Sequence, residues 1–528
     1  MALQPVLIDG QWRAAAATGT FRADNPATRE QLADEYPVSA WADCDAALSA
    51  AVGAHEALRT TTPETIARFL ERFAERIEAR AGAIVDMAHL ETAYPKSPRL
   101  ADVELPRTTN QLRQAAVATR DGSWQRVTID RKANIRSRHA SIGPVCVFGP
   151  NNFPLAFGSA SGGDFVAAIA AGNPVIAKAN SSHPGTTRLF AEEAQAAVAE
   201  VSLPAATVQL LYRTSHADGE RLVADPRVGA TGYTGSRAAG LTLKAAADKA
   251  GKPIYLELSS VNPVVILPGA LAERREQLVG EFMTSCLMGT GQFCTNPGLI
   301  ILLDGGESQA FIADVAKKFT AAPVGTLLSS GVGKSLSAGI EKLRAAGAEV
   351  LAGGDAAAAG SGAGYCCANT LLRTTAAKFV ADAETWQTEL FGNASLIVVA
   401  SNANEAAAVL DHLEGNLTGC IYSDTRGGDD GLYDQLAPRL RPHVGRLLND
   451  KMPTGVAVSP AMNHGGPFPA TGHSGFTAVG MPASLWRFTA LECYDNVREH
   501  RLPAAMRDKN PSAATWRSID GQWTQSDA

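Results

Sequence analysis

The chain has no excess of positive charge and no apolar run long enough to span a membrane. Its 47 lysines and arginines stand against 53 aspartates and glutamates, for a net charge of −6. Because binding to nucleic-acid phosphates needs a basic surface, we expect no nucleic-acid partner. No segment approaches the roughly 20 apolar residues of a transmembrane helix, so we expect no membrane span. Residues 1–12 lack the charged start and apolar core of a signal peptide, which predicts a cytoplasmic protein.

Local metal-binding and disulfide patterns are also missing. None of the eight cysteines belongs to a CxxC pair or to a Cys/His ligand spacing, so we expect no bound metal. Their spacing does not indicate a disulfide framework, and a reactive thiol suits a reducing cytosol. They are Cys44, Cys146, Cys286, Cys294, Cys366, Cys367, Cys420 and Cys493.

What is present is typical of an α/β enzyme. The 528 residues suggest two or three domains, and the 49 glycines suit tight strand-to-helix turns. Residues 40–120 show helical periodicity. Between about 140 and 256, apolar strands alternate with helices such as 161–171 and 185–201, which predicts a parallel, doubly wound sheet. The predicted strands are Gly143–Phe148, Pro174–Ala177, Val208–Leu211, Gly229–Tyr233 and Ile254–Leu258.

Three further segments carry weaker signals. The Gly- and Ala-rich stretch 353–364 predicts a surface loop. Asp-Gly-Gln-Trp occurs at 9–12 and again at 520–523, which we interpret as two unrelated hairpins. Residues 485–494 alternate between apolar and polar side chains, as in a strand.

Cys294 lies in the most informative segment, 288–299, between a predicted helix (276–287) and an apolar strand (299–303). Gly-Thr-Gly precedes it and Asn-Pro-Gly follows it. A buried structural cysteine needs neither, whereas a nucleophile needs backbone close to the substrate and room for a tetrahedral adduct. The segment therefore favours a catalytic cysteine over a structural one.

Two other segments supply possible partners for this cysteine. Glu257 stands in an otherwise apolar, strand-like run and could be a general base, although a structural glutamate paired with a buried lysine or arginine is the alternative. The strand 145–148 breaks into a turn with Asn151 and Asn152. One of these could stabilise an oxyanion or merely form the turn, and spacing alone does not choose between them.

These motifs resemble the aldehyde dehydrogenase superfamily, in order, from about Asp9 to about Pro511. Gly-Gln-Phe-Cys-Thr-Asn-Pro-Gly, Gly-Pro-x-Asn-Phe-Pro and the motif that begins at His464 (His-Gly-Gly-Pro-Phe-Pro-Ala-Thr) are similar to one branch of it. That branch holds the α-ketoglutaric semialdehyde (2,5-dioxovalerate) dehydrogenases and the fatty-aldehyde dehydrogenase of luminous bacteria.

The resemblance implies a fold and an assembly. We expect a Rossmann-like cofactor domain (1–123 and 141–256), an α/β catalytic domain (257–460), and a small β arm with a C-terminal extension (124–140 and 485–528). In relatives the arm pairs with a neighbouring subunit, which implies a homodimer or homotetramer.

The resemblance also implies a mechanism. Cys294 would attack the aldehyde, Asn152 and the backbone N–H of Cys294 would stabilise the alkoxide, and a hydride would leave to the nicotinamide. Glu257 would then activate water to hydrolyse the thioester. Relatives that pass the acyl group to coenzyme A typically lack this acid, so its presence favours a free carboxylate product.

The cofactor would be NADP or NAD. Lys178 matches a lysine that holds the adenosine ribose, and Gly235 and Ser236 lie in a turn whose amides could meet the pyrophosphate. Ser181 stands where many NAD-preferring relatives carry a glutamate, so nothing there repels a 2′-phosphate. The remaining matches are His216 near that phosphate, and Glu389 and Phe391 at the nicotinamide ribose and ring.

At the substrate end, Arg107 falls where many relatives place an apolar side chain, and Phe153 follows the oxyanion asparagine. Arg107 could anchor a substrate carboxylate, or it could be a surface arginine paired with Glu104. Arg113 would serve structure.

The expected reaction is oxidation of 2,5-dioxopentanoate to 2-oxoglutarate. The alternatives are another semialdehyde or an aliphatic aldehyde, a cysteine hydrolase without hydride transfer, and a non-catalytic homologue. A hydrolase would have no use for the dinucleotide-binding residues.

Overall fold

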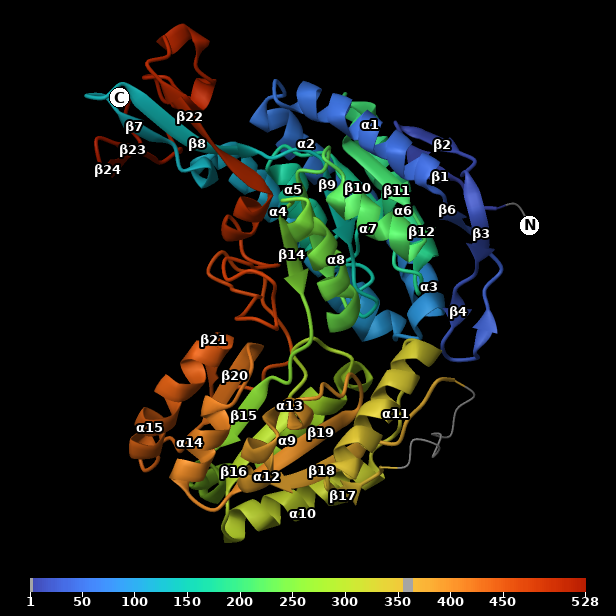
Figure 1. Ribbon diagram of the computed structural model, residues 1–528, viewed down its shortest axis with the longest axis vertical. Coiled ribbons are helices and arrows are strands. Elements are labelled where there is room, and N and C mark those ends of the chain that lie inside the picture. The colour runs from blue at the N-terminus through green and yellow to red at the C-terminus, as the bar shows by residue number, and fades with distance from the viewer. Residues whose placement is uncertain (1–2, 355–363) are drawn as a thin grey trace.

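The computed structural model describes residues 3–354 and 364–528. Figure 1 shows two lobes joined by thin connections, with an arm of strands projecting from the upper lobe. The predicted α/β class is confirmed. Most of the stretch predicted as a surface loop, 353–364, lies outside the described residues. Within the described chain, none of the helices is both long and apolar enough to cross a membrane.

The upper lobe is built on a seven-stranded sheet, ordered β14-β13-β9-β10-β11-β1-β2. The five strands predicted between 140 and 256 are its parallel part, and each lies within two residues of its predicted bounds. They are β9 (Val145–Phe148), β10 (Val175–Lys178), β11 (Val208–Leu211), β13 (Ala230–Thr234) and β14 (Ile254–Glu257).

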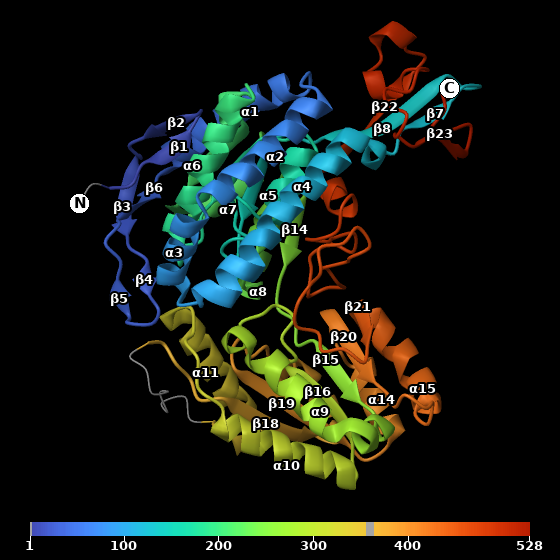
Figure 2. The ribbon, with the colours of Figure 1, turned by 180° about the vertical axis from the view of Figure 1, so that it is seen from behind.

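Helices cover both faces of this sheet, as Figures 1 and 2 show from opposite sides. Helix α2 illustrates why they form: Thr62 caps its first turn, Pro63 occupies the first helical position, and Ile66, Phe69, Leu70 and Phe73 are buried at helical spacing. The helices are α1 (Trp41–Leu58), α2 (Pro63–Ala79), α3 (Ala81–Thr92), α4 (Leu105–Asp121), α5 (Gly163–Ala170), α6 (Pro184–Glu200), α7 (His216–Ala224) and α8 (Arg237–Lys249).

The lower lobe has a second seven-stranded sheet, ordered β17-β18-β19-β16-β15-β20-β21, in which only β17 runs antiparallel. Its middle strands are apolar and buried throughout, as expected when helices cover both faces. The strands are β15 (Pro263–Ile266), β16 (Leu299–Leu303), β17 (Glu349–Ala352), β18 (Thr370–Thr375), β19 (Ala394–Ala400), β20 (Asn416–Tyr422) and β21 (Val444–Asn449).

The helices of this lobe include the one before Cys294, which begins eight residues earlier than predicted, at Pro268. They are α9 (Pro268–Leu287), α10 (Gly306–Ala321), α11 (Ser330–Ala345), α12 (Ala376–Ala381), α13 (Ala383–Trp386), α14 (Ala403–Asp411) and α15 (Asp430–Leu440).

The arm is a five-stranded sheet, ordered β22-β8-β7-β23-β24. Its strands are β7 (Thr128–Asp130), β8 (Ile135–Ser141), β22 (Thr489–Asp495), β23 (Arg517–Ile519) and β24 (Gln522–Thr524). The prediction that the strand starts at residue 485 was wrong: Ala483–Phe488 is a 3-10 helix, because Leu485 and Phe488 turn into the core of the upper lobe.

The two Asp-Gly-Gln-Trp segments are indeed separate hairpins. The first joins β1 (Val6–Ile8) to β2 (Gln11–Arg13) at the edge of the upper sheet, and the second joins β23 to β24 in the arm. Short sheets at the outer edge of the upper lobe complete the fold: β3 (Ala17–Phe21), β6 (Tyr36–Ser39) and β12 (Arg213–Thr214), and β4 (Asp24–Asn25) with β5 (Glu30–Gln31).

Candidate active site

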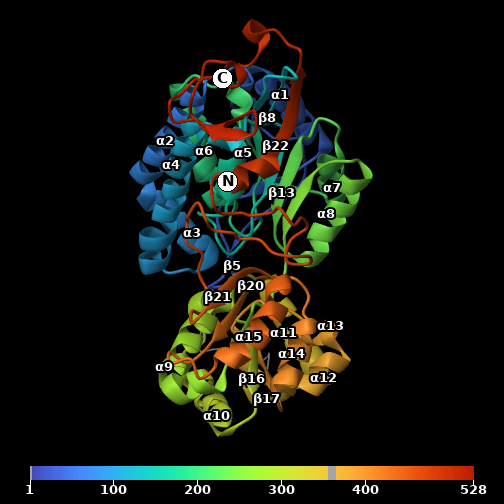
Figure 3. The same cartoon turned by 90° about the vertical axis from the view of Figure 1, so that its left-hand side faces the viewer.

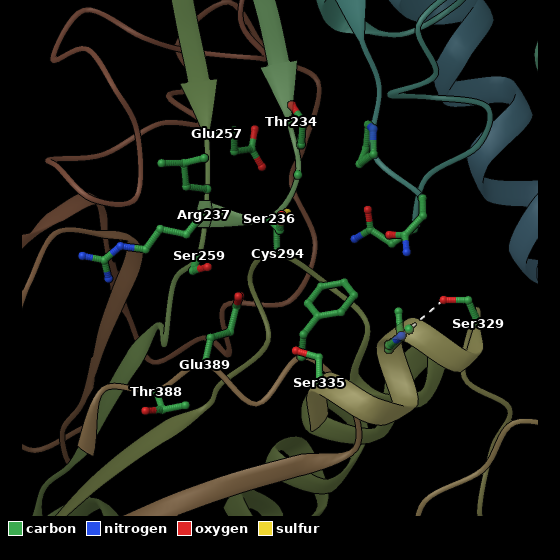
Figure 4. Close-up of a pocket in the computed structure, with 18 of the residues that line it drawn as sticks. Thr234, Ser236, Arg237, Glu257, Ser259, Cys294, Ser329, Ser335, Thr388 and Glu389 are labelled. Carbon is green, nitrogen blue, oxygen red and sulfur yellow. Dashed lines mark hydrogen bonds between the residues drawn. The ribbon is translucent and has the colours of Figure 1, made fainter. Parts of the chain in front are cut away.

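Figure 3 shows the two lobes one above the other. A cavity of about 770 Å³ is lined by residues of both lobes. Its lining joins the carboxyl ends of β13 and β14 to the Cys294 loop and to the segment before β19, as Figure 4 shows. Such a size is ordinary for a cofactor site. The predicted site residues on its wall are Asn152, Gly235, Ser236, Glu257, Cys294, Glu389 and Phe391.

Cys294 follows α9 through a tight turn, Met288–Gly291. The turn needs its glycines: Gly291 has a φ of +69°, and a Cβ added there would lie 2.0 Å from the carbonyl oxygen of Gly392. The backbone carbonyl of Cys294 accepts a hydrogen bond from Asn262 Nδ2 (2.9 Å), which fixes the loop at the cysteine. The close backbone approach inferred from Gly-Thr-Gly is therefore present.

Two side chains from distant parts of the chain, those of His464 and Glu257, lie next to the cysteine. The Sγ of Cys294 lies 3.4 Å from Nε2 of His464, and the same nitrogen lies 3.0 Å from Oε1 of Glu257. Glu257 and His464 are each 2% exposed. The alternative of a lysine or arginine partner for Glu257 was wrong, because its partner is this histidine.

His464 is a residue of the candidate site that the sequence analysis missed. Its motif contributed to the resemblance, but 170 residues separate it from Cys294 and no local spacing links the two. Burial and the nearby Glu257 carboxylate raise the pKa of the Cys294 thiol well above its usual value. The cysteine therefore rests protonated, and a neighbouring base must remove its proton before it can attack.

Asn152, rather than Asn151, is tied to the cysteine loop. It is 4% exposed, and its Nδ2 donates to the carbonyl of Gln292 (2.9 Å), two residues before Cys294. Its amide is therefore held beside the nucleophile, where an oxyanion donor is needed.

An ion pair between the partly buried Arg99 and the buried Glu104 contacts both the Asn152 turn and the Cys294 loop. Arg99 Nη2 donates to the carbonyl of Asn152 (3.2 Å), and its guanidinium lies over the rings of Phe153 (4.2 Å) and Phe293 (4.8 Å). Glu104 is fully buried 3.4 Å from Arg99, and its Oε1 accepts the N–H groups that begin the next turn, at residues 155 and 156. Phe153 is thus packed beneath the nucleophile loop rather than on the cavity wall.

Arg107 does not pair with Glu104, so that alternative was wrong. It is partly buried, one nitrogen donates to the carbonyl of Val456, and its guanidinium lies 5.2 Å from the ring of Phe157, which neighbours His464. Its Nε and Nη2 are buried without a hydrogen-bond partner among the described residues, and burial lowers its pKa. Arg113 instead forms a surface pair with Glu78 (2.6 Å).

The rest of the cavity offers groups that suit a dinucleotide. Ser236 precedes the first turn of α8, so the free N–H groups of this helix face the cavity. Burial raises the pKa of Glu389 to about 7, and its Oε1 accepts the N–H of Ser260 (3.3 Å).

The other predicted cofactor residues follow neighbouring parallel strands, at the carboxyl edge where such ligands bind. Lys178 ends β10, and burial lowers its pKa to about 8. Ser181 lies three residues further on, and His216 is exposed at the start of α7.

Comparison with known proteins decides the family. The model described as "Aldehyde dehydrogenase family" matches residues 12–481. The chain belongs to this family. Its members oxidise aldehydes with NAD(P), so the chain is an NAD(P)-dependent aldehyde dehydrogenase, and the hydrolase and non-catalytic alternatives are set aside.

Individual similar proteins are also aldehyde dehydrogenases. The chain is 38% identical over 526 residues to alpha-ketoglutaric semialdehyde dehydrogenase 2 of Azospirillum brasilense, covering 97% of this chain and 98% of the relative. It is 34% identical to alpha-ketoglutaric semialdehyde dehydrogenase of Acinetobacter baylyi, covering 98% of each. Aldehyde dehydrogenase C of Pseudomonas syringae, solved with NAD+ and octanal, shares the fold with a TM-score of 0.80 at 21% identity, over 93% of this chain and 96% of that one.

Proposed function

We propose that this aldehyde dehydrogenase oxidises 2,5-dioxopentanoate to 2-oxoglutarate. The observation that carries the proposal is Arg107, a partly buried guanidinium beside Phe157, the ring that neighbours His464. Two of its nitrogens are free of hydrogen bonds among the described residues. A buried cation in that state is costly unless a ligand anion completes it. The similarity to two α-ketoglutaric semialdehyde dehydrogenases supports the same substrate.

The residues around Cys294 supply the proton transfers. In its Nδ1–H form, His464 can accept the thiol proton at Nε2, and the resulting imidazolium lies within hydrogen-bond distance of the Glu257 carboxylate, which stabilises it. The thiolate then adds to the aldehyde carbon, and Asn152 Nδ2 donates to the alkoxide. After oxidation, Glu257 removes a proton from the water that hydrolyses the Cys294 thioester.

Bound NAD(P) supplies the hydride acceptor. We propose that Lys178, Ser181 and His216 hold its adenosine end, Gly235 and Ser236 its pyrophosphate, and Glu389 and Phe391 its nicotinamide end. The cavity volume and the α8 amides fit such a ligand.

The substrate proposal is tested by comparing Arg107→Ala with Arg113→Ala. A bidentate contact to the distant carboxylate adds affinity and orientation, so Arg107→Ala should raise the KM for 2,5-dioxopentanoate about tenfold or more, a loss near 1.5 kcal/mol. Linear aliphatic aldehydes should be much less affected. Arg113→Ala removes an arginine of the same helix that pairs with Glu78, and it should change the KM of neither substrate.

If Arg107→Ala slows charged and uncharged aldehydes alike, or neither, the carboxylate anchor is disproved. A wild-type enzyme that prefers aliphatic aldehydes would favour the fatty-aldehyde alternative. NAD(P)H formation, followed by absorbance with each aldehyde, gives both results.

We further propose a cytoplasmic homodimer or homotetramer in which 124–140 and 485–528 form the intersubunit arm. In the same proposal, 1–123 and 141–256 form the cofactor-binding domain and 257–460 the catalytic domain. The projecting sheet β22-β8-β7-β23-β24 supports the role of the arm.

A further inference from the structure

We propose that Cys294, His464 and Glu257 also form a binding site for Zn²⁺, and that zinc held there reversibly blocks the enzyme. One ligand atom from each residue lies within 4.8 Å of the other two. Across the described ranges 3–354 and 364–528, no second group of three His, Cys, Asp or Glu ligands is placed in this way.

Two of the three distances between the ligand atoms are close to those around a zinc ion. Zinc bonds to sulfur at about 2.3 Å and to nitrogen or oxygen at about 2.0 Å, which in a tetrahedron puts neighbouring ligand atoms about 3.3 to 3.6 Å apart. Here Sγ and Nε2 are 3.4 Å apart, and Nε2 and Oε1 are 3.0 Å apart. The third pair, Sγ of Cys294 and the ligating oxygen of Glu257, lies within 4.8 Å, and it would close by up to about an ångström as the ion replaces the proton at Nε2.

The number of ligands and the access also fit. Three protein ligands and one open position are typical of zinc sites that exchange their fourth ligand. Cys294 and Glu257 line the cavity, so an ion can enter from it and a water can complete the tetrahedron. Glu257 Oε2 is buried with no hydrogen-bond partner in the described part of the chain, so no hydrogen bond of this oxygen has to break when the carboxylate binds zinc.

Binding needs no oxidant or reductant. The Cys294 thiol loses its proton to solvent, a sulfur–zinc bond forms, and the metal replaces that proton on the sulfur. The pKa of the free thiol is no obstacle at neutral pH, because a coordinated thiol is deprotonated outright. With Cys294 and Glu257 both bound to the metal, neither aldehyde addition nor thioester hydrolysis can proceed.

The sequence analysis expected no bound metal, on the basis of local ligand spacing, which cannot detect ligands that come from separate segments. The three ligands come from β14, from the loop after α9 and from the segment before β22, so they form no recognisable ligand spacing in the sequence. A soft sulfur and an imidazole favour Zn²⁺, Co²⁺ or Cd²⁺ over Mg²⁺, which prefers six oxygens.

The test uses the full-length reduced protein without cofactor or aldehyde. Cobalt(II) serves as the spectroscopic probe, and a chelator competition measures zinc affinity. We expect a thiolate-to-cobalt charge-transfer band and strong tetrahedral d–d bands in the wild type. Cys294→Ala should abolish the charge-transfer band, and His464→Asn should lower the affinity for zinc about tenfold or more. Cys493→Ser, which removes an exposed thiol far from the site in sequence, is the matched control and should bind as the wild type does.

A second measurement needs no variant. Zinc should protect Cys294 of the wild type from iodoacetamide, as read by peptide mass, and added chelator should restore alkylation and activity, whereas Mg²⁺ should do neither. Absence of the charge-transfer band in the wild type, a zinc affinity in Cys294→Ala and His464→Asn equal to that of the wild type, or alkylation unaffected by zinc would each overturn the proposal. Because binding is measured without aldehyde, these outcomes are independent of which substrate the enzyme prefers.

Discussion

At the scale of single residues, Glu257 and His464 share one hydrogen bond but act at different steps. Glu257→Gln should keep the first hydride transfer, because the amide oxygen of the glutamine can still accept a hydrogen bond from the His464 imidazolium. It should stall thioester hydrolysis, because general-base catalysis contributes about 10² to 10⁴ in rate. Rapid mixing should then show a burst of one NAD(P)H per active site followed by slow turnover. A steady state equal to that of the wild type would remove Glu257 from the role of base.

His464→Asn should give the opposite pattern. The variant loses the group 3.4 Å from Sγ that accepts the thiol proton, so the burst itself should slow at neutral pH. Iodoacetamide should alkylate Cys294 more slowly for the same reason. A burst as fast as that of the wild type would show that another group activates the thiol.

Three of the four proposed catalytic residues can be found from the sequence alone and the fourth cannot, for a physical reason. Cys294, Glu257 and Asn152 each stand out locally: a thiol among glycines, an acid in an apolar strand, an asparagine in a turn. His464 stands out only through its contacts, which depend on how the 464–473 segment is bridged back to β14 at Glu257 and Thr471. Arg99 could not be identified from the sequence either, because it is recognised by its contacts with the rings of Phe153 and Phe293, which come from other segments.

At the scale of elements, the segment before α4 holds the oxyanion loop through Arg99. Arg99→Met should lower kcat/KM about 10- to 100-fold, the loss expected when a catalytic group is misplaced by an ångström. Arg99→Lys, which keeps the charge but loses the fork, should recover part of it.

If Arg99 acts through Asn152, Arg99→Met should lower kcat/KM only slightly in a variant that already carries Asn152→Ala. The double-mutant cycle in kcat/KM therefore tests the position of the amide apart from general stability. Strictly additive effects would show that Arg99 only stabilises the fold.

Ser181, which follows the carboxyl end of β10, allows a prediction about cofactor preference. Ser181→Glu places a negative charge beside the proposed 2′-phosphate site, so it should raise the KM for NADP⁺ about tenfold or more, near 1.4 kcal/mol, and that for NAD⁺ far less. Ser181→Gln has the same shape without the charge and should spare NADP⁺. An equal change for both cofactors would show that this position does not face the 2′-phosphate.

Elements themselves were the easiest part to predict. The parallel strands of the upper sheet combine apolar runs with glycine turns, and their predicted bounds differ by at most two residues from those observed. The strand from 485 failed because alternation over 485–488 arises from packing of Leu485 and Phe488 into a core cluster, which periodicity alone cannot distinguish from a sheet.

At the scale of the whole molecule, the projecting arm exposes a strand edge that a single copy leaves open. Strand β22 pairs with β8 on one side and forms the border of its sheet on the other, and Leu491 on it is 69% exposed. Open edges with exposed apolar side chains are templates for pairing with another chain. We therefore expect β22 to lie in the subunit interface.

Leu491→Lys should lower the molecular mass measured by light scattering or sedimentation toward that of one 55.1 kDa chain. Buried charge at an interface opposes association, whereas a lysine on a free surface does not. Val117→Lys on α4 is the matched control, since Val117 is 65% exposed and lies outside the arm. If both variants keep the wild-type mass, β22 does not hold the oligomer together; if the wild type itself runs as a single chain, the proposed homo-oligomer is wrong.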